Sequence, residues 1–218
     1  YEVLVRMLNP KGEEVSPSEF IAAANDEGLT GKIDRWVVLN SIKQLGEHRS
    51  KGHNTHLFIH LSSASLQDQT FLPWLSLALK AERLPADALV MQISEPDAIE
   101  YLKQAKALTQ GLAELHCKVS INQFGCAANP FNTLKHINAD FVRVDGSYTQ
   151  DLANPENLEA LKVLLTSLHA QAQITVVPCV ETATTMAALW QTGANYIQGY
   201  FLQAPSPVMD FEFSSGND

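Results

Sequence analysis

The sequence predicts an α/β protein in which helices pack outside a parallel sheet. Short β-rich runs alternate with longer amphipathic runs along the chain, an order typical of strands joined by helical crossovers. The 218 residues, of which 45% are hydrophobic, suffice for one substantial core, and no linker, low-complexity tract or charge block divides them. Such a sheet either closes into a barrel or stays open and doubly wound. No Gly-x-Gly-x-x-Gly follows the first run, which disfavours the dinucleotide-binding version of the open sheet.

Seven runs rich in β-branched and other apolar residues are predicted as strands. They cover residues 2–8, 56–61, 89–94, 118–122, 140–145, 174–180 and 196–198, the last of which is weak. Each is short and bounded by polar or turn-forming residues, as expected for strands that are connected by helices.

Six runs with apolar residues at three- and four-residue spacing are predicted as helices. They cover residues 18–27, 32–49, 71–82, 97–115, 155–171 and 182–192. Ser18 is expected to cap the first helix and Gly28 to end it. Trp36, Trp74 and Trp190 lie on the apolar faces of these runs, and we expect them to be core or helix-packing residues.

The charge and the cysteine content narrow the classes of partner and the cellular compartment that the sequence predicts. Fifteen Lys and Arg against 24 Asp and Glu give a net charge of −9 with no basic run, which disfavours a nucleic acid partner but allows a ligand with one or two phosphates. Cys117, Cys126 and Cys179 lack the paired spacing of a disulfide framework or zinc site, which favours a reducing cytoplasm. No run is long and apolar enough for a membrane span, and no export signal is recognisable.

Polar residues gather where the predicted strands end, at the edge where parallel α/β folds carry their chemistry. In chain order they are His60, Gln92, Asn122, Gln123, Arg143, Asp145, Pro178, Glu181 and Gln198. This rim is poor in carboxylates, whereas a magnesium ion or a hydrolytic water needs them as ligands or as a general base.

Six motifs in order and in register resemble those of EAL domains, barrels that hydrolyse or bind the bacterial second messenger cyclic di-GMP. The motifs lie at residues 2–6 (Glu-Val-Leu-Val-Arg), 16–21, 33–37, 124–125, 180–182 and 196–200 (Tyr-Ile-Gln-Gly-Tyr). The resemblance implies a single TIM-like (β/α)8 barrel of the EAL type over residues 1–218. Such barrels have eight strands, so we expect the opening strand to precede residue 1 and the chain to be the C-terminal part of a larger protein; a barrel with an unpaired edge is the alternative.

The prediction of function depends on the positions at which this sequence differs from the family pattern. An active EAL phosphodiesterase holds two metal ions with a Glu, an Asn, a second Glu and a pair of Asp, aided by a Lys and a late Glu. By the resemblance, Glu2 retains the first position. The other positions hold His60 for Asn, Gln92 for Glu, Asn122 and Gln123 for the Asp pair, Arg143 for Lys and Pro178 for the late Glu. Losing the Asp pair removes about two negative charges from a divalent site, so we expect neither metal nor catalysis.

Other family positions are retained, which implies that nucleotide binding survives. The positions that line or flank the groove in the family are Glu2, Leu4, Arg6, Ser16, Pro17, Phe20, Asp34, Glu181, Gln198, Gly199 and Tyr200. Arg6 can contact a phosphate or a guanine edge, and Asp34 can accept from the guanine N1 and N2 donors. Two plainer interpretations stay open: Glu2 and Arg6 form a structural ion pair, and Asp34 is only a favourable charge in a helix's first turn.

The sequence therefore predicts a catalytically inactive receptor domain whose ligand is cyclic di-GMP. Within the family it resembles degenerate EAL domains of type IV pilus regulators. That resemblance implies a cytoplasmic role in pilus assembly and twitching motility, with a PilZ-type adaptor protein as partner. Two alternatives are kept: a weak or residual cyclic di-GMP phosphodiesterase, and a nucleotide-independent protein-interaction module.

Overall fold

The computed structural model describes residues 1–211 and 213; residues 212 and 214–218, at the end of the predicted domain, lie outside the described part. The chain forms two compact units. Unit 1 comprises residues 1–143 and unit 2 the described residues from 144 onward. Each unit is described by itself.

The sheet of unit 1 contains β3 (Leu57–His60), β4 (Leu89–Ser94) and β5 (Lys118–Phe124), followed by β6 (Phe141–Val144), which reaches the unit boundary. Strands β3, β4 and β5 are parallel, as predicted. Every residue of β4 is buried. A strand buried on both faces needs no polar alternation, which is why this run is almost continuously apolar.

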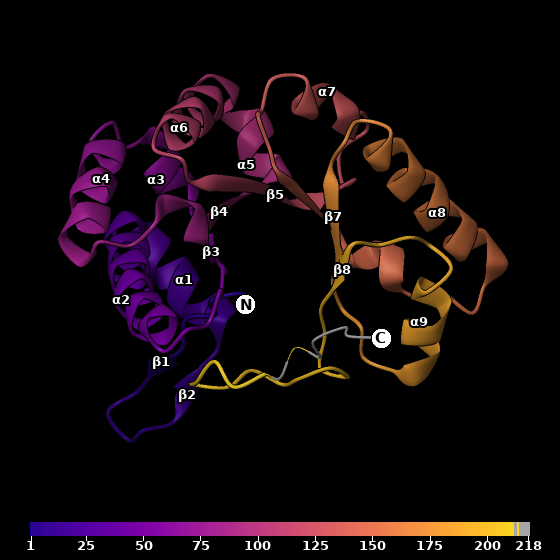
Figure 1. The fold of residues 1–218 in the computed structure, drawn as a ribbon, viewed down its shortest axis with the longest axis horizontal. Helices are drawn as coiled ribbons and strands as arrows, with labels where there is room; N and C mark the ends of the chain where they lie inside the picture. The colour runs from indigo at the N-terminus through magenta and orange to yellow at the C-terminus, as the bar shows by residue number, and fades with distance from the viewer. Residues whose placement is uncertain (212, 214–218) are drawn as a thin grey trace. The chain divides into compact units, whose positions relative to one another are not determined.

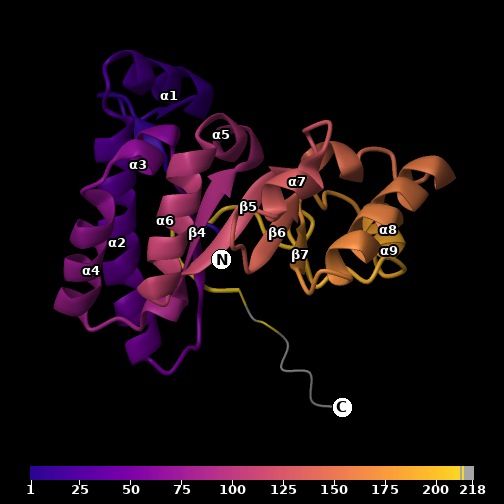
Figure 2. The same ribbon diagram turned by 90° about the horizontal axis from the view of Figure 1, so that it is seen from above.

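Helices cover the outer face of this sheet (Figures 1 and 2). In chain order they are α2 (Thr30–Ser50), α3 (Ser63–Gln67), α4 (Phe71–Glu82), α5 (Glu95–Glu100), α6 (Leu102–Glu114) and α7 (Pro130–Leu134), with a 3-10 turn at Ala86–Ala88. Helix α4 packs against both α2 and α6. The short α3 and α7 were not predicted.

The helix predicted over 97–115 is two helices, and that prediction was wrong in both extent and continuity. Tyr101 has φ −114° and ψ 43°, outside the helical region, and it ends α5 and begins α6. Helix α5 also starts earlier than expected, because the Ser94 hydroxyl accepts a hydrogen bond from the Asp97 amide and caps it.

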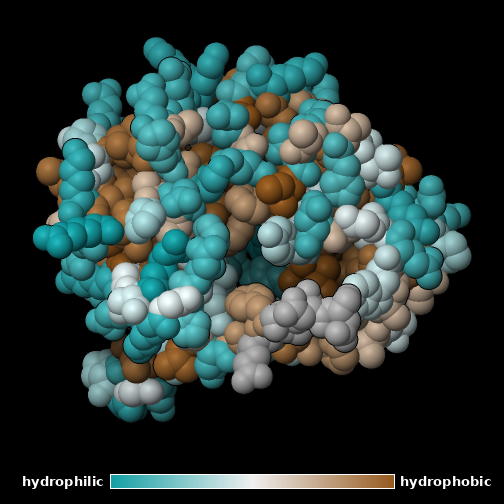
Figure 3. Space-filling view, viewed as in Figure 1, coloured by the Kyte–Doolittle hydropathy of each residue, from teal (hydrophilic) through white to brown (hydrophobic). Residues whose placement is uncertain are grey.

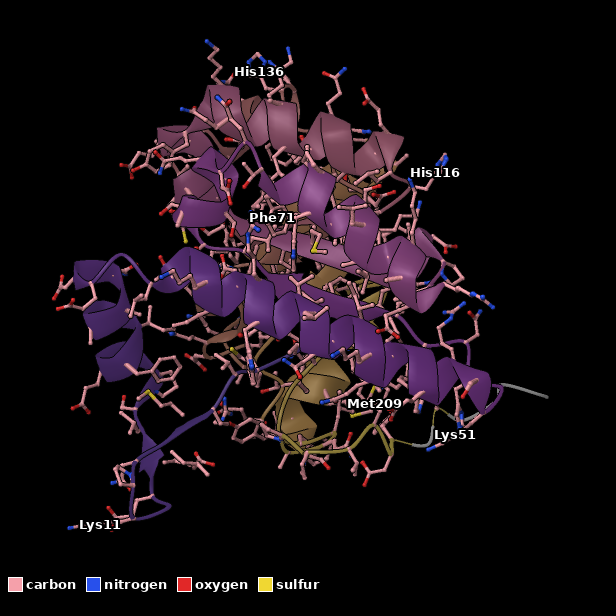
Figure 4. All side chains as sticks on the ribbon, turned by 90° about the vertical axis from the view of Figure 1, so that its left-hand side faces the viewer. Lys11, Lys51, Phe71, His116, His136 and Met209 are labelled. Atoms are coloured by element: carbon pink, nitrogen blue, oxygen red, sulfur yellow. The ribbon has the colours of Figure 1, made fainter. Side chains whose placement is uncertain are left out.

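The strand predicted over 2–8 is likewise interrupted. Glu2 forms a parallel bridge with Phe58 on β3, and the chain then enters a hairpin of β1 (Met7–Leu8) and β2 (Glu14–Val15). The turn follows from Asn9, whose side-chain oxygen accepts the amides of two residues within it. Figure 4 shows Lys11 at the tip of this hairpin, pointing away from the rest of unit 1.

Helix α1 (Pro17–Asp26) begins one residue before the prediction. Its cap is Ser16 and not Ser18, because Pro17 occupies the first turn, where its missing amide hydrogen costs nothing. Gly28 follows the helix with φ 64°, as expected of a residue that ends one.

The tryptophan prediction was wrong for two of three residues. Trp36 and Trp190 are 61% and 76% exposed, whereas Trp74 is half-buried beneath the Arg35 guanidinium, 5.0 Å from its ring centroid. The buried face of α2 includes Asp34 and Val38. Trp36 lies two residues after Asp34, about 200° around the helix, and so points to the opposite side.

Unit 2 pairs β7 (Ile174–Val177) in parallel with β8 (Tyr196–Ile197). Helices α8 (Pro155–His169) and α9 (Ala183–Leu189) and a 3-10 turn at Gly146–Thr149 complete it. Strand β7 ends three residues before the prediction, because Pro178 lacks an amide hydrogen and Cys179 has φ 60°. The buried leucine face of α8 supplies the core of this unit.

Figure 3 shows hydrophilic side chains over most of the unit 1 helices on the face in view, with apolar side chains between them. Within the described residues, none of the helices combines the length and the hydropathy that crossing a bilayer requires.

Candidate functional site

A polar surface lies on the face of the unit 1 sheet opposite the helices. Gln92 is in register with His60 on one side and with Ser120 on the other, so these three side chains point the same way. Their chain neighbours Met91 and Ile121 point toward the helices and are fully buried. We use the term polar floor for the group Glu2, His60, Gln92, Ser120, Asn122 and Arg143.

Glu2 and Arg143 join the polar floor through direct contacts. A carboxylate oxygen of Glu2 lies 3.6 Å from a guanidinium nitrogen of Arg143, and the other lies 3.4 Å from the Gln92 amide nitrogen. Arg143 also donates to the Asn122 side-chain oxygen at 2.8 Å. The side chains of Glu2 and Arg143 are 13% and 19% exposed, so this is a largely desolvated ion pair.

The remaining degenerate positions of unit 1 are Asn122, which contacts Arg143, and Gln123 and His60. The Asn122 oxygen that receives Arg143 also accepts the Gln123 amide at 2.8 Å. Gln123 itself is exposed and has φ 55°, a left-handed conformation that Asn or Asp tolerates better than Gln. His60 is exposed at the end of β3.

The predicted groove residues near the N-terminus are mostly accessible. Arg6 lies 3.7 Å from a Glu14 carboxylate oxygen and donates to the Val5 carbonyl at 3.1 Å. Leu4 is 47% exposed. Ser16 and Pro17 are exposed at the start of α1, whereas Phe20 is buried. Arg6 therefore pairs with Glu14 on the hairpin, while Glu2 pairs with Arg143.

Asp34 is a buried structural acceptor. One of its oxygens accepts from the Ser62 amide at 2.8 Å and from the Ser62 and Ser65 hydroxyls at 2.6 Å each. These hydrogen bonds join α2 to the start of α3. It lies beyond the first turn of α2, which begins at Thr30, so the first-turn charge interpretation is wrong. Its contact with guanine stays a prediction.

In unit 2 the predicted residues meet where the chain leaves β7. The Val180 amide donates to the Gln198 carbonyl, and the Phe201 amide donates to the Val180 carbonyl. A Cβ on Gly199 would collide with the Val180 backbone, so only glycine fits there. Pro178 is buried, Gln198 is half-buried, and Glu181 and Tyr200 are exposed.

Cys117 and Asp68 are two of the titratable groups of unit 1 outside the polar floor whose pKa values are shifted. Burial raises the pKa of the Cys117 thiol to about 12. Hydrogen bonds from the Thr70 hydroxyl and from Arg35 lower the pKa of Asp68. Both shifts follow from packing and local pairing and mark no second reactive centre.

Sequence reasoning missed three residues of these arrangements. Ser120 belongs to the polar floor, and its signal was available, because it lies two residues before Asn122 on the same strand and therefore on the same face. Ser62 and Ser65 hold Asp34 across about thirty residues of chain, and no local pattern indicates that contact.

The fold and the site together indicate the class of protein to which this chain belongs. The family model of the EAL domain matches residues 1–205, and the chain belongs to the EAL domain family. The predicted fold class, a TIM-like barrel of the EAL type, is confirmed.

Two solved structures and one curated protein show what the chain is similar to. The FimX EAL domain from Pseudomonas aeruginosa bound to c-di-GMP is 61% identical, with a TM-score of 0.94 over 98% of this chain and 86% of that one. The Xanthomonas citri FimX EAL domain in complex with c-diGMP is 29% identical, with a TM-score of 0.92 over 98% and 84%. Cyclic di-GMP phosphodiesterase PdeF of Escherichia coli K12 is 29% identical over 96% of this chain but only 28% of PdeF.

The residues of the polar floor do not fit the metal pair of the family's phosphodiesterases. Glu2 alone supplies a carboxylate, and it faces a guanidinium and an amide N–H. The Asn122 oxygen already accepts two hydrogen bonds. Within the described residues, no group of three or more His, Cys, Asp or Glu side chains is placed to hold a metal ion.

Proposed function

We propose that this chain is a catalytically inactive receptor domain for cyclic di-GMP. The observation that carries the proposal is the polar floor, where neutral amides stand at the family's metal-ligand positions and a guanidinium pairs with Glu2, while the groove residues are retained. Two FimX EAL domains similar to this chain over nearly its whole length were solved with c-di-GMP bound. Receptor function therefore suits the residues better than hydrolysis does.

Nucleotide binding without metal ions requires another source of positive charge for the two phosphates. Arg6 can supply it, because its side chain is 35% exposed and its 3.7 Å contact with Glu14 is weak. A charge-assisted hydrogen bond from a guanidinium to a phosphate is stronger than that contact. Leu4 offers exposed apolar surface on the same segment.

Hydrolysis is disfavoured by the same groups. Cleaving a phosphodiester at neutral pH needs a water activated by a metal ion or a general base. Gln92 and Asn122 are neutral amides, and Glu2 is paired with Arg143. None of these side chains is suited to take a proton from water.

The proposed biological role is regulatory. The resemblance to degenerate EAL domains of type IV pilus regulators supports a role in pilus assembly and twitching motility, with a PilZ-type adaptor as partner in the cytoplasm. Pull-down of such an adaptor with and without the dinucleotide tests this role. Twitching lost upon deletion and restored by the intact gene would support it, and unchanged twitching would contradict it.

Isothermal titration with cyclic di-GMP tests the receptor proposal. We expect binding to the wild-type chain, and a loss of about 10- to 100-fold in affinity for Arg6→Ala, because a hydrogen bond to a charged group contributes about 1.5–3 kcal/mol. Lys11→Ala is the matched control, since it removes one positive charge from the tip of the same hairpin. Absence of heat at tens of micromolar protein would refute the proposal.

A parallel assay tests inactivity. We expect no linear dinucleotide when the protein is incubated with cyclic di-GMP and magnesium or manganese. Product that accumulates with the wild-type chain and disappears in Glu2→Ala would establish the alternative of residual phosphodiesterase activity.

A further inference from the structure

The Arg143 guanidinium spans two positions that bind metal in active relatives. It reaches Glu2 with one terminal nitrogen at 3.6 Å and Asn122 with the other at 2.8 Å. By the family resemblance, Glu2 is the first metal ligand and Asn122 is the first of the paired Asp. One planar cation therefore joins both ends of the former metal site.

This cation compensates the charge of Glu2. A carboxylate that is 13% exposed is costly unless an opposite charge or hydrogen bonds accompany it. Arg143 supplies both. A divalent ion that approaches Glu2 would be repelled by the Arg143 guanidinium, which lies 3.6 Å from the Glu2 carboxylate.

Other buried polar atoms near Arg143 are better suited to bind a water molecule or another hydrogen-bonding group than a second cation. Arg143 Nε, Gln92 Oε1 and Ser120 Oγ are buried and make no hydrogen bond within the described residues. Gln92 and Ser120 are register partners on β4 and β5. Because Arg143 Nε is a donor on a cation, a water or another oxygen can bind there, whereas a metal ion cannot.

We infer that Arg143 is a resident cation that takes the place of the metal ions and actively excludes them. This goes beyond the proposed function, because it concerns metal binding and requires no nucleotide. It has a testable consequence: restoring the lost carboxylates will restore metal binding only weakly while Arg143 remains. Lys, the family residue at this position, is a compact charge on a flexible stem and does not bridge two ligands in one plane.

Binding of Mn²⁺, measured from the electron paramagnetic resonance signal of the free ion without nucleotide, tests the inference. The carboxylate-restored protein carries His60→Asn, Gln92→Glu, Asn122→Asp and Gln123→Asp. We expect it to bind Mn²⁺ about 10- to 100-fold more weakly than the same protein with Arg143→Lys added, the range seen when groups around metal ligands change. Equal affinity in the two proteins would overturn the inference, and so would Mn²⁺ binding by the wild-type chain at tens of micromolar.

A thermal double-mutant cycle keeps the inference testable if the multiple variants fail to fold. Arg143→Met should lower the melting temperature by about 5 °C or more, because it leaves Glu2 buried without its counter-charge. In the Glu2→Gln background the same substitution should cost less than half as much. An equal loss in both backgrounds would show that Arg143 does not compensate Glu2 and would overturn the inference, whatever the nucleotide titration shows.

Discussion

Asp34 and Asp68 form a natural pair for testing how burial changes the value of a carboxylate. Each accepts three hydrogen bonds: Asp34 from Ser62 and Ser65, and Asp68 from Arg35 and Thr70. The difference is exposure, since Asp34 is 8% exposed and the Asp68 side chain 34%. Replacing each by Ala thus compares the same loss in two environments.

We expect Asp34→Ala to lower the free energy of unfolding by about 3 kcal/mol, because it leaves a partly buried backbone N–H and two hydroxyls without their carboxylate acceptor. Asp34→Asn keeps an acceptor oxygen and should cost about 1 kcal/mol. Asp68→Ala should cost at most about 1 kcal/mol, as exposed ion pairs do. For a chain of this size, the buried loss corresponds to a fall of about 6–12 °C in melting temperature.

Urea unfolding at pH 7, followed by circular dichroism, measures all three variants. If Asp34→Ala and Asp68→Ala differ by less than about 1 kcal/mol, burial does not set the value of these carboxylates and the reasoning fails. Titration of Asp34→Asn with cyclic di-GMP, well below its melting temperature, then isolates the predicted guanine contact. A folded Asp34→Asn that binds as tightly as wild type would leave Asp34 a purely structural role.

Three further predictions concern acidity, packing and reactivity. The pKa of Asp68 is lowered in the folded state, so the stability that its carboxylate contributes is complete above about pH 4 and is lost as the pH falls through the folded pKa. The loss of stability in Asp68→Asn should therefore vanish in acid. A loss that persists in acid would contradict the ion-pair account. Gly199→Ala should lower the melting temperature by several degrees, because its Cβ collides with the Val180 backbone, whereas an unchanged melting curve would mean that the loop moves freely. A thiol reagent should modify the two exposed cysteines of the native protein quickly and Cys117 only after denaturation, since burial raises its pKa to about 12; rapid native modification of all three would show that this core opens readily.

Local patterns predicted the repeated architecture well, because each strand or helix of an α/β fold shows its own period. Strand β4 (Leu89–Ser94) matches its predicted bounds, as does helix α4 (Phe71–Glu82). The errors arose where one residue overrides the pattern. Asn9 closes a turn inside a β-rich run, and Tyr101 leaves the helical region inside a helical run.

The sequence indicated which residues to expect in the candidate site, but not which of their side chains contact one another. The family resemblance indicated which positions had changed, yet nothing local indicates that Arg143 meets Glu2 across almost the whole of unit 1. The bonds from Ser62 and Ser65 to Asp34 are similarly non-local. Contacts of this kind follow from tertiary packing within unit 1, which places together residues that no sequence window contains.

The changes in the polar floor preserve local neutrality by a different route. In an active relative, two divalent ions balance several carboxylates. Here Gln92 and Asn122 keep the size and hydrogen-bonding character of Glu and Asp while losing their charge, and the remaining carboxylate, Glu2, faces one guanidinium. A metal-free floor that had kept all its carboxylates would hold like charges in a desolvated place, at a cost that burial makes large. In the proposed metal-free receptor, loss of the metal ions and neutralisation of their ligands are therefore physically coupled, and Arg143 supplies the positive charge that balances Glu2.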